Sequence, residues 1–369
     1  MKIAYFTHSL RSCWNHGNAH FLRGVLTELI ARGHDVEAFE PAGAWSLSNL
    51  LKDEGAEALK PFERLYADLR STTYGGDADV AELVDDADLV IVHEWNEPRL
   101  VAELGRVRRR GGRFLLLFHD THHRAVSAPE EMRAYDLEDY DGVLAFGETI
   151  SEIYREWGWR DRVFTWHEAA DIRRFHPPAE EGAREGLIWI GNWGDDERSE
   201  EIVDFLLRPA QDAQLPLDIY GVRYPDRAKR MLAEQGARYH GWIANAAAPE
   251  AFARHLATVH VPRRYYTQLL PGIPTIRVFE ALACGIPLVS APWSDSEGLF
   301  RVGEDFLMVS NGEEMTRVLT QLKSDPELRK SMVESGLETI RKRHTCAHRA
   351  GELMNIYATL RTPAEAAAA

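Results

Sequence analysis

The sequence is poor in cysteine. Its 369 residues include three, Cys13, Cys284 and Cys346, which lie far apart. A small, odd and scattered set argues against a disulfide framework and against a cysteine metal cluster. We therefore expect a reducing compartment, the cytoplasm.

Long hydrophobic runs and an excess of positive charge are also missing. No apolar stretch approaches the roughly 18 residues of a membrane-spanning helix, and the opening residues, MKIAYF, have the pattern of a strand rather than of a signal peptide. With 43 basic and 58 acidic residues the formal net charge is −15, so a polyanion such as duplex DNA would be repelled. We expect neither a spanning segment nor a nucleic-acid partner, and leave the oligomeric state open.

What the chain does have is an ordinary globular composition, with 45% hydrophobic and 27% charged residues. Its length suits two domains of about 150 to 180 residues each. The loop HSLRSCWNHGNAH (residues 8–20) lacks the G-x-G-x-x-G fingerprint, so a dinucleotide cofactor is not expected.

Apolar runs alternate with helical patterns along the whole chain, which favours parallel sheets and an α/β fold. In the first half the predicted strands are residues 2–7, 34–41, 87–94, 113–120, 141–148 and 162–169. A segment rich in Pro, Gly and charge, 175–186, precedes a second half with the same alternation. We expect domains at 1–175 and 183–345, and a last helix, 346–361, that returns to the first domain.

Polar side chains end several of these strands. Glu94 and Trp95 follow one strand, and His119 and Asp120 end the next. Open parallel sheets bind ligands at this edge, and an aromatic ring beside polar groups suits a sugar, although Trp95 would serve equally to cover the core. The histidine-rich segment HDTHHR could hold a metal, but Asp120 precedes a turn that it would cap. We expect no metal site.

The most informative stretch is PGIPTIRVFEALACGIPLVS, residues 271–290. A Pro- and Gly-rich loop that leads into a helix offers backbone N–H groups to an anion such as a diphosphate. Glu280, one turn further on, can accept hydrogen bonds from both hydroxyls of a ribose, or is a surface residue of an ordinary α/β unit. The candidate diphosphate contacts are Gly272, Ile273, Pro274, Thr275 and Arg277, with Arg263 and Arg264 as rivals.

The residues RVFEALACGIPLV (277–289), followed downstream by HTCAHR (344–349), resemble the C-terminal domain of the CgeB-like glycosyltransferases, a group related to retaining glycosyltransferase family 4. DIRRFHP (171–177) and IWIGNW (188–193) extend the resemblance more weakly over nearly the whole chain. It implies the GT-B fold, in which two Rossmann-like domains face each other across a cleft. The nucleotide sugar is then held mostly by the second domain and the acceptor mostly by the first.

The resemblance also implies an activity. A sugar moves from a nucleotide-diphosphate sugar to an acceptor hydroxyl with retention of configuration. Neither a metal ion nor another cofactor is expected, because helix N-termini and basic side chains can neutralise the leaving diphosphate. The alternatives are a nucleotide-sugar epimerase or phosphorylase of the same fold, and a non-catalytic sugar-nucleotide-binding module.

In the first half, the resemblance matches His119 to a histidine that touches the donor sugar or the reacting centre, and we expect Asp120 to act beside it. Gly17 and Asn18 match a first loop that approaches the donor phosphate or the acceptor. Alternatively, that loop only caps the helix that follows it.

In the second half, Asn192 lies in the matched phosphate loop, and Trp242 lies in YHGW, which resembles the segment that contacts the base. Arg198 would replace a lysine that the family often carries, because a guanidinium can grip phosphate oxygens in pairs. Alternatively, Arg198 is a first-turn helix residue paired with Glu197 or Glu201.

One position departs from the family pattern. Many family 4 members carry two glutamates eight residues apart, and the second matches Glu280, whereas the first position is Gly272. Since the missing carboxylate usually lies near the donor sugar, the identity of the sugar and the retaining outcome stay open.

Overall fold

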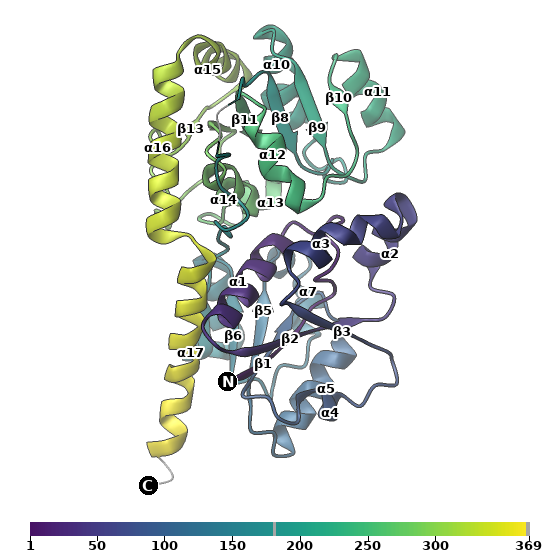
Figure 1. The fold of residues 1–369 in the computed structure, drawn as a ribbon. Helices are drawn as coiled ribbons and strands as arrows, with labels where there is room; N and C mark the ends of the chain where they lie inside the picture. The colour runs from purple at the N-terminus through teal and green to yellow at the C-terminus, as the bar shows by residue number, and fades with distance from the viewer. Residues whose placement is uncertain (180–181, 367–369) are drawn as a thin grey trace. The chain divides into compact units, whose positions relative to one another are not determined.

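The computed structural model describes residues 1–179 and 182–366, which form two compact α/β units (Figure 1). The first unit comprises residues 1–168 and the chain from Cys346 onward, and the second comprises Ala169–Thr345. The predicted domain end at residue 175 lies inside the second unit. Residues 180 and 181 of the predicted linker, and the last three residues of the tail, lie outside the described residues.

The first unit is built on a parallel sheet of seven strands in the order β3-β2-β1-β4-β5-β6-β7. Its strands are β1 Lys2–Phe6, β2 Asp35–Pro41, β3 Arg70–Tyr74, β4 Leu89–His93, β5 Leu115–Asp120, β6 Gly142–Ala145 and β7 Val163–Thr165. Every residue of β4 and β5 is buried, as expected for central strands covered on both faces. The edge strand β3 reads RSTTY and is half exposed, so its apolar signal is too weak to predict it.

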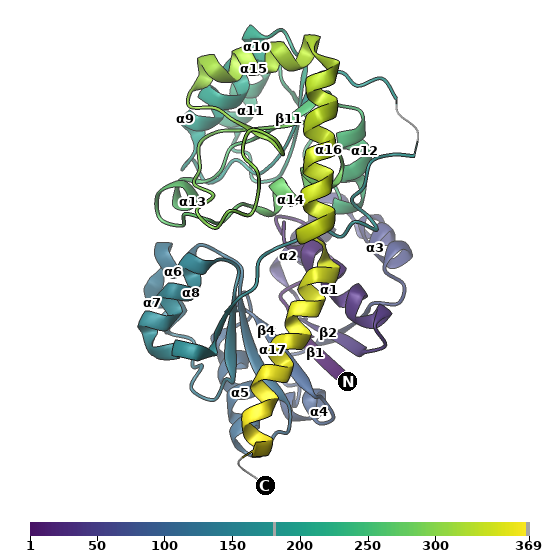
Figure 2. The ribbon, with the colours of Figure 1, turned by 90° about the vertical axis from the view of Figure 1, so that its left-hand side faces the viewer.

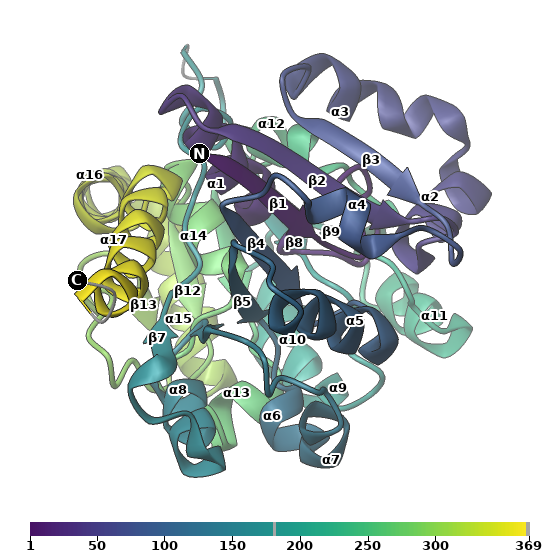
Figure 3. The same ribbon diagram turned by 90° about the horizontal axis from the view of Figure 1, so that it is seen from below.

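Helices cover both faces of this sheet. They are α1 Ala19–Ala31, α2 Trp45–Glu54, α3 Lys60–Leu65, α4 Val80–Val84, α5 Pro98–Arg109, α6 Arg124–Ser127, α7 Pro129–Arg133, α8 Glu148–Tyr154 and α17 Cys346–Ala366. Figure 3 shows α1 on one face and α4 and α5 on the other. Each crossover helix is therefore amphipathic or buried on the side that meets the strands.

Helix α17 belongs to the first unit and packs against α1 (Figure 2). Cys346, Ala350 and Leu353 are fully buried, and their spacing of four and three residues puts them on one helix face. Arg349 fastens the helix start, since its Nε donates to the carbonyl of His167 at 2.9 Å.

The second unit has a parallel sheet of six strands in the order β10-β9-β8-β11-β12-β13. The strands are β8 Leu187–Ile190, β9 Leu217–Tyr220, β10 Arg238–Tyr239, β11 Ala257–His260, β12 Leu288–Ser290 and β13 Leu307–Met308. Its helices are α9 Ser199–Ile202, α10 Arg208–Asp212, α11 Asp226–Glu234, α12 Ala248–Ala253, α13 Arg264–Gln268, α14 Ile276–Ala283, α15 Gly312–Ser324 and α16 Pro326–Arg343.

Helix α14 carries the most informative sequence motif, and α16 packs along it (Figure 2). The two helices approach closely at Gly336, where an added Cβ would lie 3.0 Å from Cδ2 of Leu282. Across the described residues, no helix is long and apolar enough to cross a bilayer.

Candidate functional site

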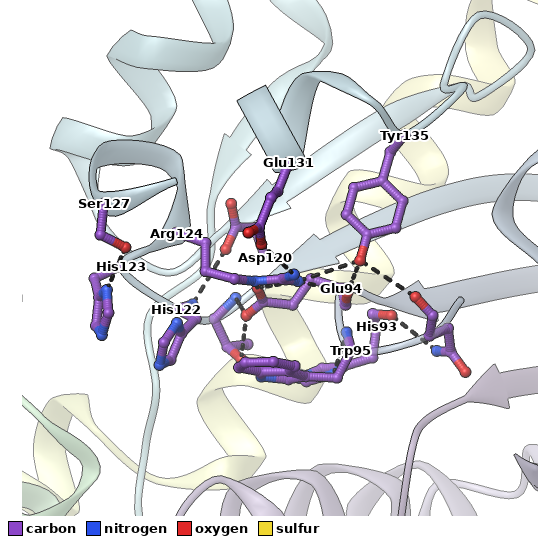
Figure 4. Close-up of polar contacts among 12 residues, drawn as sticks. His93, Glu94, Trp95, Asp120, His122, His123, Arg124, Ser127, Glu131 and Tyr135 are labelled. Atoms are coloured by element: carbon purple, nitrogen blue, oxygen red, sulfur yellow. Dashed lines mark hydrogen bonds and ion pairs between the residues drawn. The ribbon is translucent and has the colours of Figure 1, made fainter. Parts of the chain in front are cut away.

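An ion pair between Glu94 and Arg124 joins the end of β4 to the start of α6 in the first unit (Figure 4). Glu94 directly follows β4, and its backbone N–H donates to the carbonyl of His119 at 2.9 Å. Its carboxylate accepts from the backbone N–H of Thr121 at 3.0 Å and faces Nη2 of Arg124 at 3.0 Å. Glu94 has no solvent exposure, and the positive charge of Arg124 offsets part of the cost of ionising this carboxyl.

Asp120, the last residue of β5, lies beside this pair and is equally buried. It accepts hydrogen bonds from the hydroxyl of Tyr154 at 3.0 Å and from the backbone N–H of His122 at 3.1 Å. Burial raises the pKa of both carboxyls, and the charge of Asp120 adds to the rise for Glu94. The raised pKa makes the Asp120 carboxylate a better proton acceptor near neutral pH than an exposed aspartate.

Trp95 lies at the rim of this cluster and is 43% exposed, so its interpretation as a core cover is wrong. The guanidinium of Arg124 lies over its ring at 4.3 Å, and Figure 4 shows the two side chains stacked. His122 meets the same ring at a centroid distance of 5.0 Å. An exposed aromatic face remains available to an apolar ring surface.

His119, the penultimate residue of β5, is fully buried. Its Nδ1 is hydrogen-bonded to the hydroxyl of Tyr5 at 2.7 Å, and its Nε2 has no partner among the described residues. Burial lowers its pKa to about 3, so the imidazole is neutral near pH 7. It can therefore donate or accept a hydrogen bond but offers no charge.

Gly17 and Asn18 form the end of the loop that leads into α1. Nδ2 of Asn18 donates to the carbonyl of Thr121 at 3.4 Å, and its side chain does not cap α1. The loop thus meets the segment that follows β5, beside His119 and Asp120.

In the second unit, the loop after β8 carries a buried arginine, Arg198. It is 9% exposed, and Nη1 and Nη2 donate to the carbonyls of Val261 at 2.5 Å and Asn192 at 2.6 Å. Its Nε has no partner, and none of its contacts among the described residues is an ion pair with a carboxylate. Desolvation lowers its pKa to about 10.

Asn192 also contacts the loop after β9, since its Oδ1 accepts from the N–H of Val222 at 2.9 Å.

The two rival arginines are neutralised within the protein. Nε of Arg263 faces Glu197 at 2.7 Å, and Nε of Arg264 faces Glu201 at 2.6 Å. Glu197 and Glu201 are therefore paired with these two arginines, and the alternative in which Arg198 pairs with one of them is wrong.

The loop before α14 lies close to Arg198. The Gly272 N–H donates to the carbonyl of Ser294 at 2.7 Å, and Ile273 and Pro274 are buried. The hydroxyl of Thr275, just before the helix, is bonded to Nε2 of His260 at 3.1 Å. Burial lowers the pKa of His260 to about 3, and the charges of Arg198 and Arg277 lower it further.

Glu280 has no exposure and is ion-paired with Arg277 on the preceding turn of α14. Trp242 lies in the loop after β10, where its Nε1 is buried without a partner among the described residues. The structure thus gathers Arg198, Thr275 and Arg277 around His260.

Sequence reasoning missed two groups. Arg124 ends the segment HDTHHR, whose histidines suggested a metal site instead of an ion pair. No motif in the sequence around His260 indicates a role for it. No group of three or more His, Cys, Asp or Glu side chains within residues 1–179 and 182–366 has the geometry to hold a metal ion.

Residues 198–355 match the family described as glycosyl transferase-like. The match covers less than half of the chain and includes Arg198 and the whole of α14. Among curated proteins, no sequence match was found.

Solved structures match over both units. A sucrose-phosphate synthase from Thermosynechococcus elongatus has a TM-score of 0.67 at 16% identity, over 98% of this chain and 100% of that chain. HepE from Anabaena, solved with UDP and glucose, has a TM-score of 0.68 at 13% identity, over 97% and 100%. An α-glucosyltransferase solved with UDP and DNA has a TM-score of 0.71 at 14% identity, over 97% and 99%.

The predicted fold class is confirmed, because these relatives are GT-B glycosyltransferases and both sheets have parallel, Rossmann-like topology. The match to the glycosyl transferase-like family lies within the second half of the chain. Neither finding distinguishes the CgeB-like group or family 4 from other glycosyltransferases.

Proposed function

We propose that this protein transfers a glycosyl group from a nucleotide-diphosphate sugar to an acceptor hydroxyl. The observation that carries the proposal is Arg198, a buried guanidinium held by two carbonyls and lacking a carboxylate partner among the described residues. A buried, uncompensated cation is costly, and a bound anion would offset that cost. Arg198 lies within the family match, which supports a nucleoside diphosphate as the anion.

In the reaction, the bond between the anomeric carbon and the diphosphate oxygen breaks, and its electron pair leaves with the nucleoside diphosphate. The acceptor oxygen bonds to the anomeric carbon and gives up its proton. Arg198 and the backbone N–H groups at the start of α14 would stabilise the leaving diphosphate. For this reason we propose that no metal ion or other cofactor is needed.

The remaining roles in the second unit follow the family resemblance. Glu280 would bind the ribose, which requires Arg277 to turn aside because the carboxylate has no exposed surface. Asn192 would line the phosphate loop, and Trp242, with its unpartnered indole N–H, would contact the base. Retention of configuration is proposed on the resemblance alone.

In the first unit, we propose Asp120 as the group that takes the acceptor proton, because burial raises its pKa. His119 would touch the reacting sugar as a neutral hydrogen-bonding group. The α-glucosyltransferase relative was solved with DNA, but a net charge of −15 opposes a polyanionic acceptor. We propose an acceptor other than nucleic acid.

A thermal-shift screen of the full chain against nucleoside diphosphates and their sugars, in EDTA, tests the proposal. We expect at least one nucleoside diphosphate to raise the Tm by mass action, and its sugar to be consumed when a hydroxyl acceptor is supplied. If no nucleoside diphosphate shifts the Tm, the proposed function fails. Turnover that stops in EDTA and returns with manganese would contradict only the metal-independent mechanism.

A further inference from the structure

Four histidines gather at the carboxyl ends of three adjacent strands in the first unit, β1, β4 and β5. His8 and His16 lie in the loop after β1, His93 ends β4 and His119 lies in β5. The ring centroids of His8 and His16 are 4.1 Å apart, those of His16 and His93 6.2 Å, and those of His93 and His119 5.5 Å. We call these four residues the histidine cluster.

The histidine cluster is uncharged near pH 7. Burial lowers the pKa of His8 to about 4 and that of His119 to about 3, and it lowers those of His16 and His93 well below the usual value. Two arginines lie nearby, and both are engaged. Arg23 donates to the carbonyls of Leu10 at 2.7 Å and Arg11 at 3.0 Å, and Arg124 faces Glu94.

Three ring nitrogens of the cluster lack a hydrogen-bond partner among the described residues, although they are buried: Nδ1 of His8, Nε2 of His16 and Nε2 of His119. His16 is 6% exposed and His119 is fully buried. A buried polar group without a partner costs roughly 1 to 3 kcal/mol. His8 and His16 are in contact, and His119 joins them through His93, so a ligand that reaches these rings could satisfy the three nitrogens.

The ligand can be narrowed by chemistry. A neutral imidazole presents one hydrogen-bond donor and one acceptor, and a hydroxyl group can accept from the donor or donate to the acceptor. Neutral rings give an ionised ligand no counter-charge, and no set of three side chains among the described residues forms a metal site. Beside the cluster lies Trp95, whose ring centroid is 6.2 Å from that of His8 and which is exposed. Its face suits the apolar side of a sugar ring.

We propose that His8 and His16 of the histidine cluster, with Trp95, bind the acceptor beside the reacting sugar that His119 touches, and that this acceptor is an uncharged polyhydroxylated molecule, a neutral sugar or polyol. The inference rests on the proposed function and adds the chemical class of the acceptor. It assigns His8 and His16 to acceptor binding, a role that the sequence did not suggest for either residue.

The test uses His8→Phe and His16→Phe, which keep an aromatic ring but remove its nitrogens. His34→Phe is the matched control, because His34 also has an unpartnered Nδ1 and directly precedes β2, at the opposite edge of the same sheet. Long-range proton–nitrogen NMR spectra of the histidine rings are recorded while the full chain is titrated with neutral methyl glycosides, with neutral disaccharides, or with methyl glucuronoside as a charged comparator.

We expect a neutral glycoside to shift the ring-nitrogen signals of His8 and His16, and methyl glucuronoside to leave them in place. Each cluster variant should bind that glycoside about five- to tenfold more weakly without a lower Tm, while His34→Phe binds as the wild type does. The proposal is overturned if no neutral glycoside moves these signals, or if the cluster variants lose Tm and keep affinity.

Two further measurements distinguish a donor sugar from an acceptor sugar, and failure of the sugar site from failure of the proposed function. If UDP-glucose moves the signals but no free glycoside does, the cluster binds the donor sugar and the acceptor assignment is wrong. If glycosides bind while calorimetry shows no binding of any nucleoside diphosphate, the proposed transferase function fails but the sugar site stands.

Discussion

At the scale of single residues, the charge of Arg198 decides the proposed donor site. Arg198→Met removes the guanidinium and should weaken nucleoside diphosphate binding at least tenfold, because a charge-assisted hydrogen bond contributes about 1.5 to 3 kcal/mol. Stability should change little, since two backbone carbonyls lose their donor while the cost of burying a charge disappears. Calorimetry with the nucleoside diphosphate that raises the Tm of the wild type, and a melting curve, measure the two effects.

Arg208→Met is the control, because Arg208 lies on α10 in an exposed i,i+4 pair with Asp204. It should bind the same nucleoside diphosphate as the wild type does. Unchanged affinity in Arg198→Met would remove this residue from the site.

Residue-level prediction from the sequence worked where a strand end fixed the position. Glu94, His119 and Asp120 were expected at the carboxyl edge of the first sheet, and the strand register puts them together there. The histidine cluster could not be predicted, because His8, His16 and His93 meet only once β1 and β4 pair, and nothing in the local sequence indicates which side chains will be buried.

At the scale of elements, the loop that leads into α14 depends on Gly272. Its φ is +89°, and an added Cβ would lie 2.7 Å from Cγ of Glu297 and 2.9 Å from Oγ of Ser296. Gly272→Ala should therefore lower the free energy of unfolding by about 2 to 3 kcal/mol, from left-handed strain of about 1 kcal/mol together with the collision. Urea unfolding at constant m-value measures the loss.

Gly298→Ala supplies the comparison for this loop. Its φ of +62° imposes the same kind of strain, but an added Cβ meets nothing within 4 Å, so it should cost only about 1 kcal/mol. If both variants lose the same free energy of unfolding, the side chain of Glu297 moves away from the added Cβ without cost.

The element pattern was predictable for buried strands and long helices. Continuous apolar runs marked β1, β4 and β5, and a Gly stop marked the end of α14. The pattern failed at β3 and at the two-residue strand β10, where Tyr239 of the expected YHGW turn belongs to the strand. Both are edge strands, which bury little side-chain surface and so leave little periodicity in the sequence.

At the scale of the whole molecule, buried histidines make stability depend on pH. The pKa is about 4 for His8 and about 3 for His119 and His260, against about 6.5 in an unfolded chain. Between those values the unfolded chain binds protons that the folded protein does not. Each of these histidines therefore contributes stability that is fully present above about pH 6.5. This contribution is lost as the pH falls toward 4, by about 1.4 kcal/mol per pH unit for each histidine.

Buried carboxyls act in the opposite sense, and the balance decides the outcome. Burial raises the pKa of Glu94 and Asp120, so their contribution is present at low pH and is lost as the pH rises. Five histidines have a strongly lowered pKa, since His16 and His93 join the three above, and they outnumber these two carboxyls.

We therefore expect the free energy of unfolding, measured with urea, to fall steeply from about pH 6.5 to about pH 4.5. In His8→Phe the fall should be shallower by about 1.4 kcal/mol per pH unit, because one proton fewer is taken up on unfolding. His176→Phe, at an exposed position of the second unit, should keep the wild-type slope. If His8→Phe and the wild type fall in parallel, His8 already carries its proton in the folded protein, and the neutral histidine cluster on which acceptor binding rests would not exist as described.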